Sequence, residues 1–435
     1  MDTLDLHTPP TNNLTPQKRS RNRDEEHNPL STPPTNNLTP QKRSRNNDEE
    51  HTPLSTPPSA TKRKRPMALP TLQKVDLEGS PLKEEKPKYK CIIASSTPFF
   101  PTALLNNSSL PKLNTLQGGT SGALLLDQNL VVKFAHGELG TPYRQLKFPN
   151  SPCAKSGILP GEGTFGEFLA ARLMQIWLAQ CPAHILIPES AFVNLTHPEQ
   201  LTLAESESVN SIQDLSSLID SKATLHVFIS QCRSFKALDK EGVEKLDLKA
   251  CQLTTLFDLV LLNADGNRGN LLIDKENRLV LIDRSCILPR NAESAVVSCT
   301  AELPQVQAPI DPLIRDFILK TLSSDLLPSL LKEMEAIPDA NSFDENRIQM
   351  HKWAVALVKA GTIANLSLSQ IAFLFKATSR NEDFAARSVF HVLINTAGKR
   401  TIEEACKHCI ALFQNNAGNR TLIIQSIEED CSKPV

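Results

Sequence analysis

The chain has 435 residues, and its 47 lysines and arginines nearly balance its 48 aspartates and glutamates. Total charge therefore favours neither a nucleic acid nor a membrane surface, and a nucleic-acid partner is not expected. No apolar run reaches the roughly 18 residues of a membrane-spanning helix, so no transmembrane segment is expected. The opening MDTLDLHTPP has no basic start followed by an apolar stretch, so it does not resemble a secretory signal.

Ten cysteines are scattered along the sequence without the spacing of a disulfide framework. A reducing compartment is therefore expected, which indicates an intracellular location, nuclear or cytoplasmic. Cys406 and Cys409 form a single CxxC in a segment that is predicted to be helical. A zinc site needs a second pair of ligands, and no other close Cys or His pair is present in the sequence, so metal binding there is not the favoured interpretation.

Residues 1–88 are predicted to be a disordered tail built on a repeat. The segment TPPTNNLTPQKRSRNRDEEHNPLS (8–31) recurs as TPPTNNLTPQKRSRNNDEEHTPLS (32–55), and a third copy stops after TPPS (56–59). The 24-residue repeat holds almost no apolar side chains, so stacked copies could not bury a core. The tail is therefore not expected to form a repeat domain.

The basic clusters of this tail predict a binding partner for it. The basic stretch KRKRP (62–66) favours a nuclear import receptor, with a solvated tail or attachment to anionic lipid as the alternatives. Thr15 and Thr39 each precede a proline and a basic cluster, which suits proline-directed kinases. Phosphate at either threonine would mask the neighbouring positive charge.

A globular pattern begins at about residue 89, and its first part is rich in strands. The run FGEFLAARLMQIWLAQ (165–180) predicts a helix, because its apolar residues recur at helical spacing. The other predicted elements are strands: YKCIIASS (89–96), two strands in GALLLDQNLVVKFA (122–135) around a turn at residues 127–129, ILIPESAFVNL (185–195) and LHVFISQC (225–232).

Helices dominate the second part of the pattern, after a predicted hairpin at residues 263–285. The predicted helices are DLKACQLTTLFDLVLL (247–262), IRDFILKTLSSDLLPSLLKEM (314–334) and RIQMHKWAVALVKAG (347–361). Strands with one helix followed by a helical part indicate an α+β fold in two lobes. We place the lobes at residues 89–235 and 236–435.

A cluster of small residues stands before the first strand of the pair at 122–135. It consists of Gly118, Gly119, Thr120, Ser121 and Gly122. Glycines let a backbone approach a phosphate closely and direct N–H groups toward it, although a plain turn is the alternative. Lys133 lies near the end of the second strand, where a lysine is costly unless it reaches an anion. Glu167 could pair with Lys133, and the alternative is a carboxylate placed at a helix start to suit the helix dipole.

The predicted hairpin keeps three polar residues at or beside its strand ends: Asp265, Asn270 and Asp283. Phosphoryl transfer by kinase-like enzymes needs such a set. One Asp orients the attacking hydroxyl, an Asn five residues later binds Mg²⁺, and a second Asp at the end of the next strand binds Mg²⁺ that bridges the phosphates. The alternative is an Asp-Gly turn with a polar rim.

The segment NADGNRGNLLI…LVLIDRS resembles the D-R-x-x-x-N…I-D loops of phosphoinositide 3- and 4-kinases and of actin-fragmin-kinase-like proteins, an atypical branch of the protein-kinase-like superfamily. GGTSGALLL is similar to their short glycine loop, and the resemblance covers roughly residues 113–290. It implies a two-lobed fold that catalyses phosphoryl transfer with ATP and Mg²⁺ (or Mn²⁺) as cofactors. Residues 118–122 would then bind nucleotide.

The resemblance also implies roles for single residues. Lys133 would contact ATP phosphates, Glu167 would pair with it, and Asp265 would be the catalytic Asp. Asn270 and Asp283 would hold the metal.

The segment HVFISQCRSF (226–235), with Ile229 in its centre, would meet the adenine through backbone groups. Arg268 is the third residue after Asp265, and this spacing places it where it could neutralise the transferring phosphate.

Two departures from the family pattern are present. Asn263 and Ala264 stand where most kinases have His and Arg before the catalytic Asp, and Arg284 and Ser285 replace the Phe-Gly that the atypical branch does not require. Between residues 284 and 311 the only basic residues are Arg284 and Arg290, too few for a lipid headgroup with several charges.

A Ser/Thr protein kinase is therefore preferred over a phosphoinositide kinase. A kinase fold that transfers an adenylyl group and a non-catalytic pseudokinase scaffold are two further interpretations that stay open. The repeats beside an atypical kinase-like segment are similar to secreted bacterial effectors that act inside a host cell, for which a host activator is a candidate partner.

Overall fold

The computed structural model describes ten stretches of the chain: residues 91–95, 112–115, 123–126, 130–135, 158–195, 202–203, 222–291, 296–375, 388–396 and 400–432. All of them belong to one unit, Ala68–Val435. The predictions for the repeat tail, for the glycine cluster at 118–122 and for the turn at 127–129 lie outside the described residues. The described part mixes helix and sheet, as the expected α+β class requires.

A seven-stranded sheet holds the first strands, in the order β1-β6-β8-β4-β3-β2-β7. Its strands are β1 (Cys91–Ser95), β2 (Lys112–Thr115), β3 (Leu124–Leu126), β4 (Leu130–Phe134), β6 (Ser190–Leu195), β7 (Thr202–Leu203) and β8 (Lys222–Val227). Neighbours are antiparallel except β2 and β7. The paired strands expected within residues 122–135 are confirmed as β3 and β4.

The strand predicted at residues 225–232 is wrong at both ends. β8 begins at Lys222 and ends at Val227. It lies between β6 and β4, so its register follows those two ladders. The apolar residues Phe228 and Ile229 belong instead to the chain that leaves the sheet.

A second sheet, in the order β5-β11-β10-β9, contains the predicted hairpin. It is built from β5 (Ile185–Leu186), β9 (Arg233–Ser234), β10 (Leu271–Ile273) and β11 (Leu279–Leu281). Leu271 pairs with Leu281, and the turn between the strands places Asn277 at a φ of 58°. β5 precedes the hairpin by many residues but pairs in parallel with β11, so this small sheet joins distant parts of the chain.

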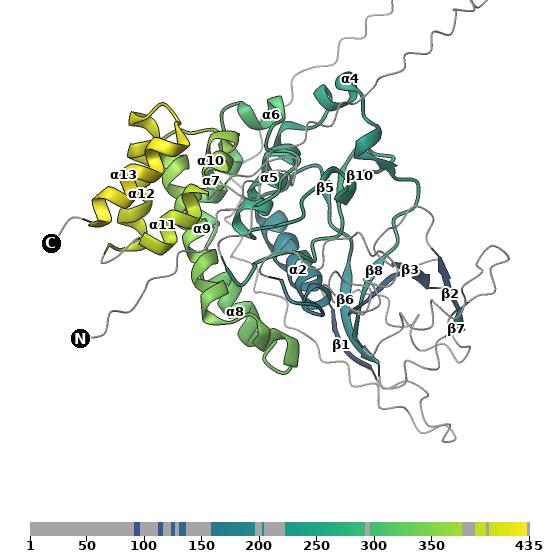
Figure 1. Cartoon of the computed structure of the whole chain (residues 1–435). Coiled ribbons are helices and arrows are strands. Elements are labelled where there is room, and N and C mark those ends of the chain that lie inside the picture. Colours follow the sequence, from purple (N-terminus) through teal and green to yellow (C-terminus); the bar gives the residue numbers. More distant parts are fainter. Residues whose placement is uncertain are drawn as a thin grey trace, which may run out of the picture. The chain divides into compact units, whose positions relative to one another are not determined.

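Helix α2 (Gly163–Gln180) confirms the predicted helix and begins two residues earlier. It runs between the strands β6 and β8 on one side and the later helices on the other (Figure 1). Phe165 meets Phe192 of β6 edge-on at 5.5 Å, and Trp177 stacks on Phe257 at 5.7 Å. Because both sides of α2 are covered, buried residues occur around most of its circumference.

The remaining described helices all come after β9 in the chain, and α4 and α5 among them precede β10. They are α4 (Lys240–Glu244), α5 (Leu248–Val260), α6 (Pro304–Gln307), α7 (Pro312–Asp316), α8 (Leu326–Glu333), α9 (Glu345–Ile363), α10 (Leu368–Leu374), α11 (Val389–Thr396), α12 (Ile402–Asn415) and α13 (Arg420–Ser432). Short helical turns are η4 (Phe235–Ala237), η5 (Arg268–Asn270), η6 (Phe317–Thr321) and η7 (Pro338–Ser342).

The single helix predicted at residues 314–334 is wrong. The segment forms α7, the π-helical turn η6, a break, and then α8. Pro328 lacks a backbone N–H and is tolerated only in the first turn of a helix, so a new helix must begin just before it. In the break, the Ser323 hydroxyl accepts a hydrogen bond from the Asp325 N–H at 3.1 Å, which competes with helical bonding.

Within the described part of the chain, no helix combines the length and the apolar character needed to cross a bilayer. Cys406 and Cys409 lie buried in α12. Burial raises the pKa of both thiols, that of Cys409 to about 12. They are therefore held as thiols rather than as the thiolates that bind metals.

Lowering the pH will destabilise the fold through His351 of α9. Its Nδ1 lies 2.8 Å from the Val260 carbonyl oxygen, and its ring stacks near Trp177. Burial lowers the pKa of His351 to about 4. The folded state thus binds fewer protons than the unfolded one, and stability present above the unfolded pKa is lost as the pH falls from about 6.5 to about 4, by roughly 3 kcal/mol.

Denaturant unfolding at several pH values measures this loss. His351→Phe keeps an aromatic ring but cannot take up a proton, so its stability should vary less over this pH window. The control His184→Gln, at an exposed position, should keep the wild-type profile. Identical profiles for His351→Phe and wild type would contradict the assignment.

Candidate active site

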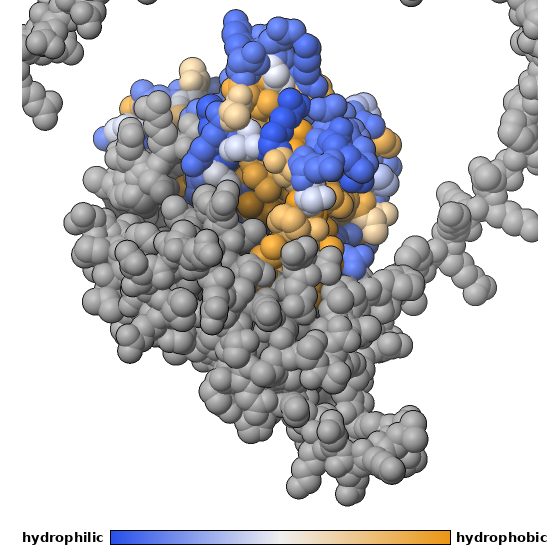
Figure 2. Space-filling view, turned by 90° about the vertical axis from the view of Figure 1, so that its right-hand side faces the viewer, coloured by the Kyte–Doolittle hydropathy of each residue, from blue (hydrophilic) through white to orange (hydrophobic). Residues whose placement is uncertain are grey.

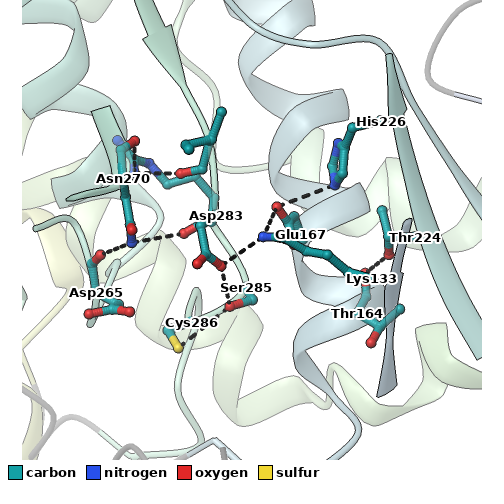
Figure 3. A network of polar contacts seen from close by, with 12 residues as sticks. Lys133, Thr164, Glu167, Thr224, His226, Asp265, Asn270, Asp283, Ser285 and Cys286 are labelled. Carbon is teal, nitrogen blue, oxygen red and sulfur yellow. Dashed lines mark hydrogen bonds and ion pairs between the residues drawn. The ribbon is translucent and has the colours of Figure 1, made fainter. Parts of the chain in front are cut away.

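Lys133 is the centre of a charged network between the first sheet and the hairpin (Figure 3). Its Nζ lies 2.8 Å from Glu167 Oε1 and 3.0 Å from Asp283 Oδ1. Burial lowers the pKa of Lys133, but the charges of Asp283 and Glu167 outweigh this and raise it above its usual value. The ammonium therefore stays charged in a largely enclosed position. The two carboxylates offset the cost of burying a lysine on β4.

Glu167 holds this lysine from the second turn of α2. Because α2 begins at Gly163, the alternative of a carboxylate at the helix start is wrong. The side chain is only 5% exposed, and His226 of β8 places its Nε2 3.2 Å from Oε1. Burial would raise the pKa of Glu167, but Lys133 and His226 lower it below its usual value. Glu167 is therefore an ionised partner for the ammonium.

The N-terminal end of α2 is fixed by a cluster of charges that we call the Glu162 clasp: Glu162, Arg290 and Arg347. Glu162 stands at the N-cap position of α2 and pairs with Arg290, whose Nε donates to Oε1 at 3.1 Å, and with the fully buried Arg347 of α9. The Arg347 guanidinium lies 4.6 Å from the centre of the Phe343 ring. Burial would raise the pKa of Glu162, but hydrogen bonds from both arginines outweigh this and lower it.

Close packing supports the same placement of α2. A Cβ on Gly166 would lie 3.1 Å from the Ser285 carbonyl oxygen, so the helix lies directly against the segment that follows Asp283. The Thr224 hydroxyl of β8 donates to the Thr164 carbonyl oxygen at 2.5 Å. The sheet and the segment after Asp283 therefore set the position from which Glu167 reaches Lys133.

Asp265 and Asn270 lie together in the loop before β10. The Asn270 Nδ2 donates to the Asp265 carbonyl oxygen at 2.6 Å and to the Asp283 carbonyl oxygen at 3.2 Å. Both bonds use the amide nitrogen of Asn270, so neither of them uses its Oδ1. The Asp265 carboxylate accepts a hydrogen bond from Asn267 Nδ2 at 3.0 Å, and its backbone N–H donates to Asn263 Oδ1 at 3.0 Å.

Asp283 adopts a φ of 53°, in the left-handed region that costs energy for most residues other than glycine. Its Oδ1 accepts a hydrogen bond from the Ser285 hydroxyl at 3.2 Å as well as the contact with Lys133. The antiparallel register of β10 and β11 brings Asn270 and Asp283 to the same end of the hairpin, as predicted.

Arg284 supports the two loops, a role that sequence reasoning missed. Its Nη1 donates to the carbonyl oxygens of Ile282 at 3.1 Å and Asn270 at 3.4 Å. Its Nε lies 3.4 Å from Asp258 Oδ1, which also accepts a hydrogen bond from Asn263 Nδ2 at 2.8 Å. Burial raises the pKa of Asp258, although Arg284 opposes this. The sequence feature that could have indicated this role is the charged Arg284 directly after Asp283, at the position where most kinases have Phe.

Two predicted site residues lie away from the Lys133 network. Arg268 begins η5 and is exposed, and no described contact joins it to Lys133 or Asp283. Ile229 lies in the chain after β8, where its carbonyl oxygen accepts a weak hydrogen bond from Cys232 Sγ at 3.6 Å. The structure thus brings together Lys133, Glu167, Asp265, Asn270 and Asp283.

Comparison with models of known protein families gives no match for this chain, and comparison with curated protein sequences gives no match either.

Proposed function

We propose that this protein is an ATP-dependent phosphotransferase with a two-lobed, protein-kinase-like fold. The observation that carries the proposal is the position of Lys133 between Glu167 and Asp283. A charged lysine held by a helix carboxylate can bind nucleotide phosphates, and a neighbouring aspartate can bind the metal that accompanies them. The lobes would meet near residue 235, with the seven-stranded sheet and α2 before it.

The oxygen groups at the hairpin end fit a Mg²⁺ or Mn²⁺ ion. Magnesium prefers oxygen ligands, and it commonly uses one or two protein carboxylates together with phosphates and waters. Asp283 offers a carboxylate and Asn270 an amide oxygen, and the side-chain amide nitrogen of Asn270 donates a hydrogen bond to the Asp283 backbone carbonyl oxygen. No group of three His, Cys, Asp or Glu residues suited to a metal occurs among the described residues, so phosphates would complete the ligand set.

Asp265 is proposed to orient the acceptor hydroxyl. Its carboxylate is held by Asn267, and its backbone is fixed by Asn263 and Asn270. In this arrangement a carboxylate accepts the hydroxyl proton while the phosphoryl group is transferred. Asn263, which stands where other kinases have His, therefore has a positioning role for this loop.

The adenine is proposed to lie against the chain that follows β8. Apolar residues gather beneath a hydrophilic rim on one face of the described part (Figure 2). Directly after β8, Phe228 remains 37% exposed and Ile229 is half-buried, as is Val227 at the end of the strand. An aromatic base would gain from burial against such side chains.

A protein Ser or Thr hydroxyl is the proposed acceptor. Both arginines that follow Asp283 are occupied: Arg284 is buried beside Asp258, and Arg290 pairs with Glu162. Neither can serve a phosphoinositide headgroup in this arrangement, which would need several cations.

We expect Mg·ATP to stabilise the full-length protein against thermal unfolding. A ligand at 100 times its Kd that binds only the folded state contributes about 2.7 kcal/mol. Asp283→Asn should lose the part of this shift that depends on Mg²⁺, because a carboxylate ligand is removed. Asp316→Asn, in an exposed i,i+4 pair with Lys320, is the matched control and should keep the full shift.

Calorimetry with ATP and with Mg²⁺ or Mn²⁺ provides an independent measurement. If wild-type protein binds no nucleotide at millimolar ATP, with and without cell lysate, the phosphotransferase proposal is wrong.

A further inference from the structure

Lys236 lies beside the Asp265 loop although the two are far apart in sequence. Ser234 of β9 pairs with Leu272 of β10, two residues after Asn270. The Ser234 hydroxyl accepts a hydrogen bond from the Lys236 N–H at 3.2 Å, and the adjacent Phe235 is only 2% exposed. These contacts hold η4 against η5, and so fix the backbone from which Lys236 extends.

Gly269 gives the Lys236 ammonium its position. A Cβ on Gly269 would lie 3.1 Å from Lys236 Nζ and 3.4 Å from its Cε. The lysine therefore crosses the loop backbone between Asp265 and Asn270. Gly269 does not have a positive φ, so the space left by its missing side chain is what the lysine uses.

Two lysines that follow Lys236 in the chain already form ion pairs. Lys240 of α4 lies 3.8 Å from Glu244, and Lys245, the residue after α4, lies 2.6 Å from Glu241. In contrast, neither Lys236 nor Arg268 forms an ion pair with a described residue, and both are exposed. We call Lys236 and Arg268 the rim cations.

We infer that the rim cations form an acceptor subsite that recognises an acidic residue next to the hydroxyl of a peptide substrate. This inference rests on the proposed phosphotransferase function. Lys133 occupies the enclosed part of the site with Glu167 and Asp283, whereas both rim cations are on the exposed edge of the loop between Asp265 and Asn270. Arg268 begins η5 in this loop, and Lys236 lies against Gly269 of the same loop. Positive charge at that edge attracts an acceptor that carries carboxylates.

The number of cations favours an acidic peptide over a lipid headgroup. Two exposed cations can each face one carboxylate. A phosphoinositide headgroup would call on further cations, and Arg284 and Arg290 are engaged by Asp258 and Glu162. The test must therefore distinguish a lipid acceptor from an acidic peptide acceptor.

The experiment uses the full-length protein, Mg·ATP and peptide mixtures in which a single Ser or Thr is flanked by Glu, Gln or Lys. Wild type should have a kcat/KM for the Glu peptides that is higher than for the Gln peptides, by roughly fivefold for each rim contact. Lys236→Glu and Arg268→Glu should remove this preference or turn it toward the Lys peptides. Lys240→Glu, an exposed lysine on α4, should keep it.

Ionic strength adds a readout that a purely structural role would not move. Because the rim contacts are exposed, the Glu-over-Gln preference should decline in 0.5 M salt, where the Debye length is about 4 Å. Thermal unfolding of Lys236→Glu should match that of Lys240→Glu, which separates recognition from folding.

Equal rates for all three peptide classes would overturn the subsite while leaving the phosphotransferase proposal in place. An equal change of the Glu-over-Gln peptide preference in Lys236→Glu and Lys240→Glu would do the same. Phosphate transfer to phosphatidylinositol vesicles and to none of the peptides would also overturn it. Absence of Mg·ATP binding in wild type would instead remove the proposed function on which the inference rests.

Discussion

Asp265→Asn will lower turnover by about 10² to 10⁴-fold, the range of a positioned acid–base group, while leaving Mg·ATP binding intact. An asparagine retains the size of the side chain, and the backbone bonds from Asn270 and to Asn263 do not involve the carboxylate. The lost group is the carboxylate that would accept the hydroxyl proton of the acceptor. Transfer of labelled phosphate from ATP measures the first effect, and calorimetry measures the second.

Asp316→Asn controls for this comparison, because it removes an exposed carboxylate that pairs with Lys320, one helical turn further along the chain. Full activity in Asp265→Asn would show that the catalytic assignment is wrong even if nucleotide binds. Loss of both activity and nucleotide binding would indicate that Asp265 supports the loop rather than the reaction.

Arg284→Met will cost about 3–5 kcal/mol of unfolding free energy, the range found when one partner of a buried ion pair is removed. The side chains of Arg284 and Asp258 are only 3% and 1% exposed. Without the guanidinium, Asp258 remains in the interior with Asn263 as a neutral partner. The carbonyl oxygens of Ile282 and Asn270 lose a donor as well.

The double variant Asp258→Asn/Arg284→Met should recover part of this loss, since no unpaired charge is left in the interior. Arg278→Met is the control: Arg278 is 34% exposed, and its partner Asp274, although only 3% exposed, keeps hydrogen bonds from the backbone N–H groups of Glu276 and Arg278. This change should therefore cost about 1 kcal/mol or less. Denaturant unfolding of wild type and the three variants gives these values. Equal losses of unfolding free energy in Arg278→Met and Arg284→Met would show that the buried pair contributes no more to stability than the partly exposed one.

The Arg284 variants also bear on the site. Arg284 binds the carbonyl oxygen of Asn270 and lies next to Asp283, which has a strained φ. If the protein binds Mg·ATP, the dependence of nucleotide binding on Mg²⁺ concentration should change more in Arg284→Met than in Arg278→Met. The reason is that both proposed metal ligands, Asn270 and Asp283, lose support.

Local pattern was sufficient for the elements whose own residues decide their structure. The apolar runs on either side of Asp274 and Asn277 predicted the hairpin, because a tight polar turn brings adjacent strands together without help from distant residues. The helical spacing of Phe168, Trp177 and their neighbours likewise predicted α2. The α+β class followed from the order of such elements.

Pattern was insufficient where a partner far along the chain sets the outcome. β8 begins and ends where β4 and β6 pair with it, and β5 joins the hairpin sheet through β11. The helix expected at 314–334 divides for a local reason instead, because Pro328 within it requires a new first turn. Such effects depend on packing or on backbone bonding that apolar periodicity does not report.

By itself the sequence determined which residues could carry the site: the lysine in an apolar strand, the glutamate in α2, and the Asp, Asn and Asp of the hairpin region. A lysine in such a strand demands an anion, and antiparallel pairing demands that Asn270 and Asp283 share an end. Only the tertiary structure decided that the Lys133 anions are both Glu167 and Asp283, and that Arg284 is buried while Lys236 reaches Gly269. The physical reason is that burial and ion pairing depend on distances between segments that no local pattern contains.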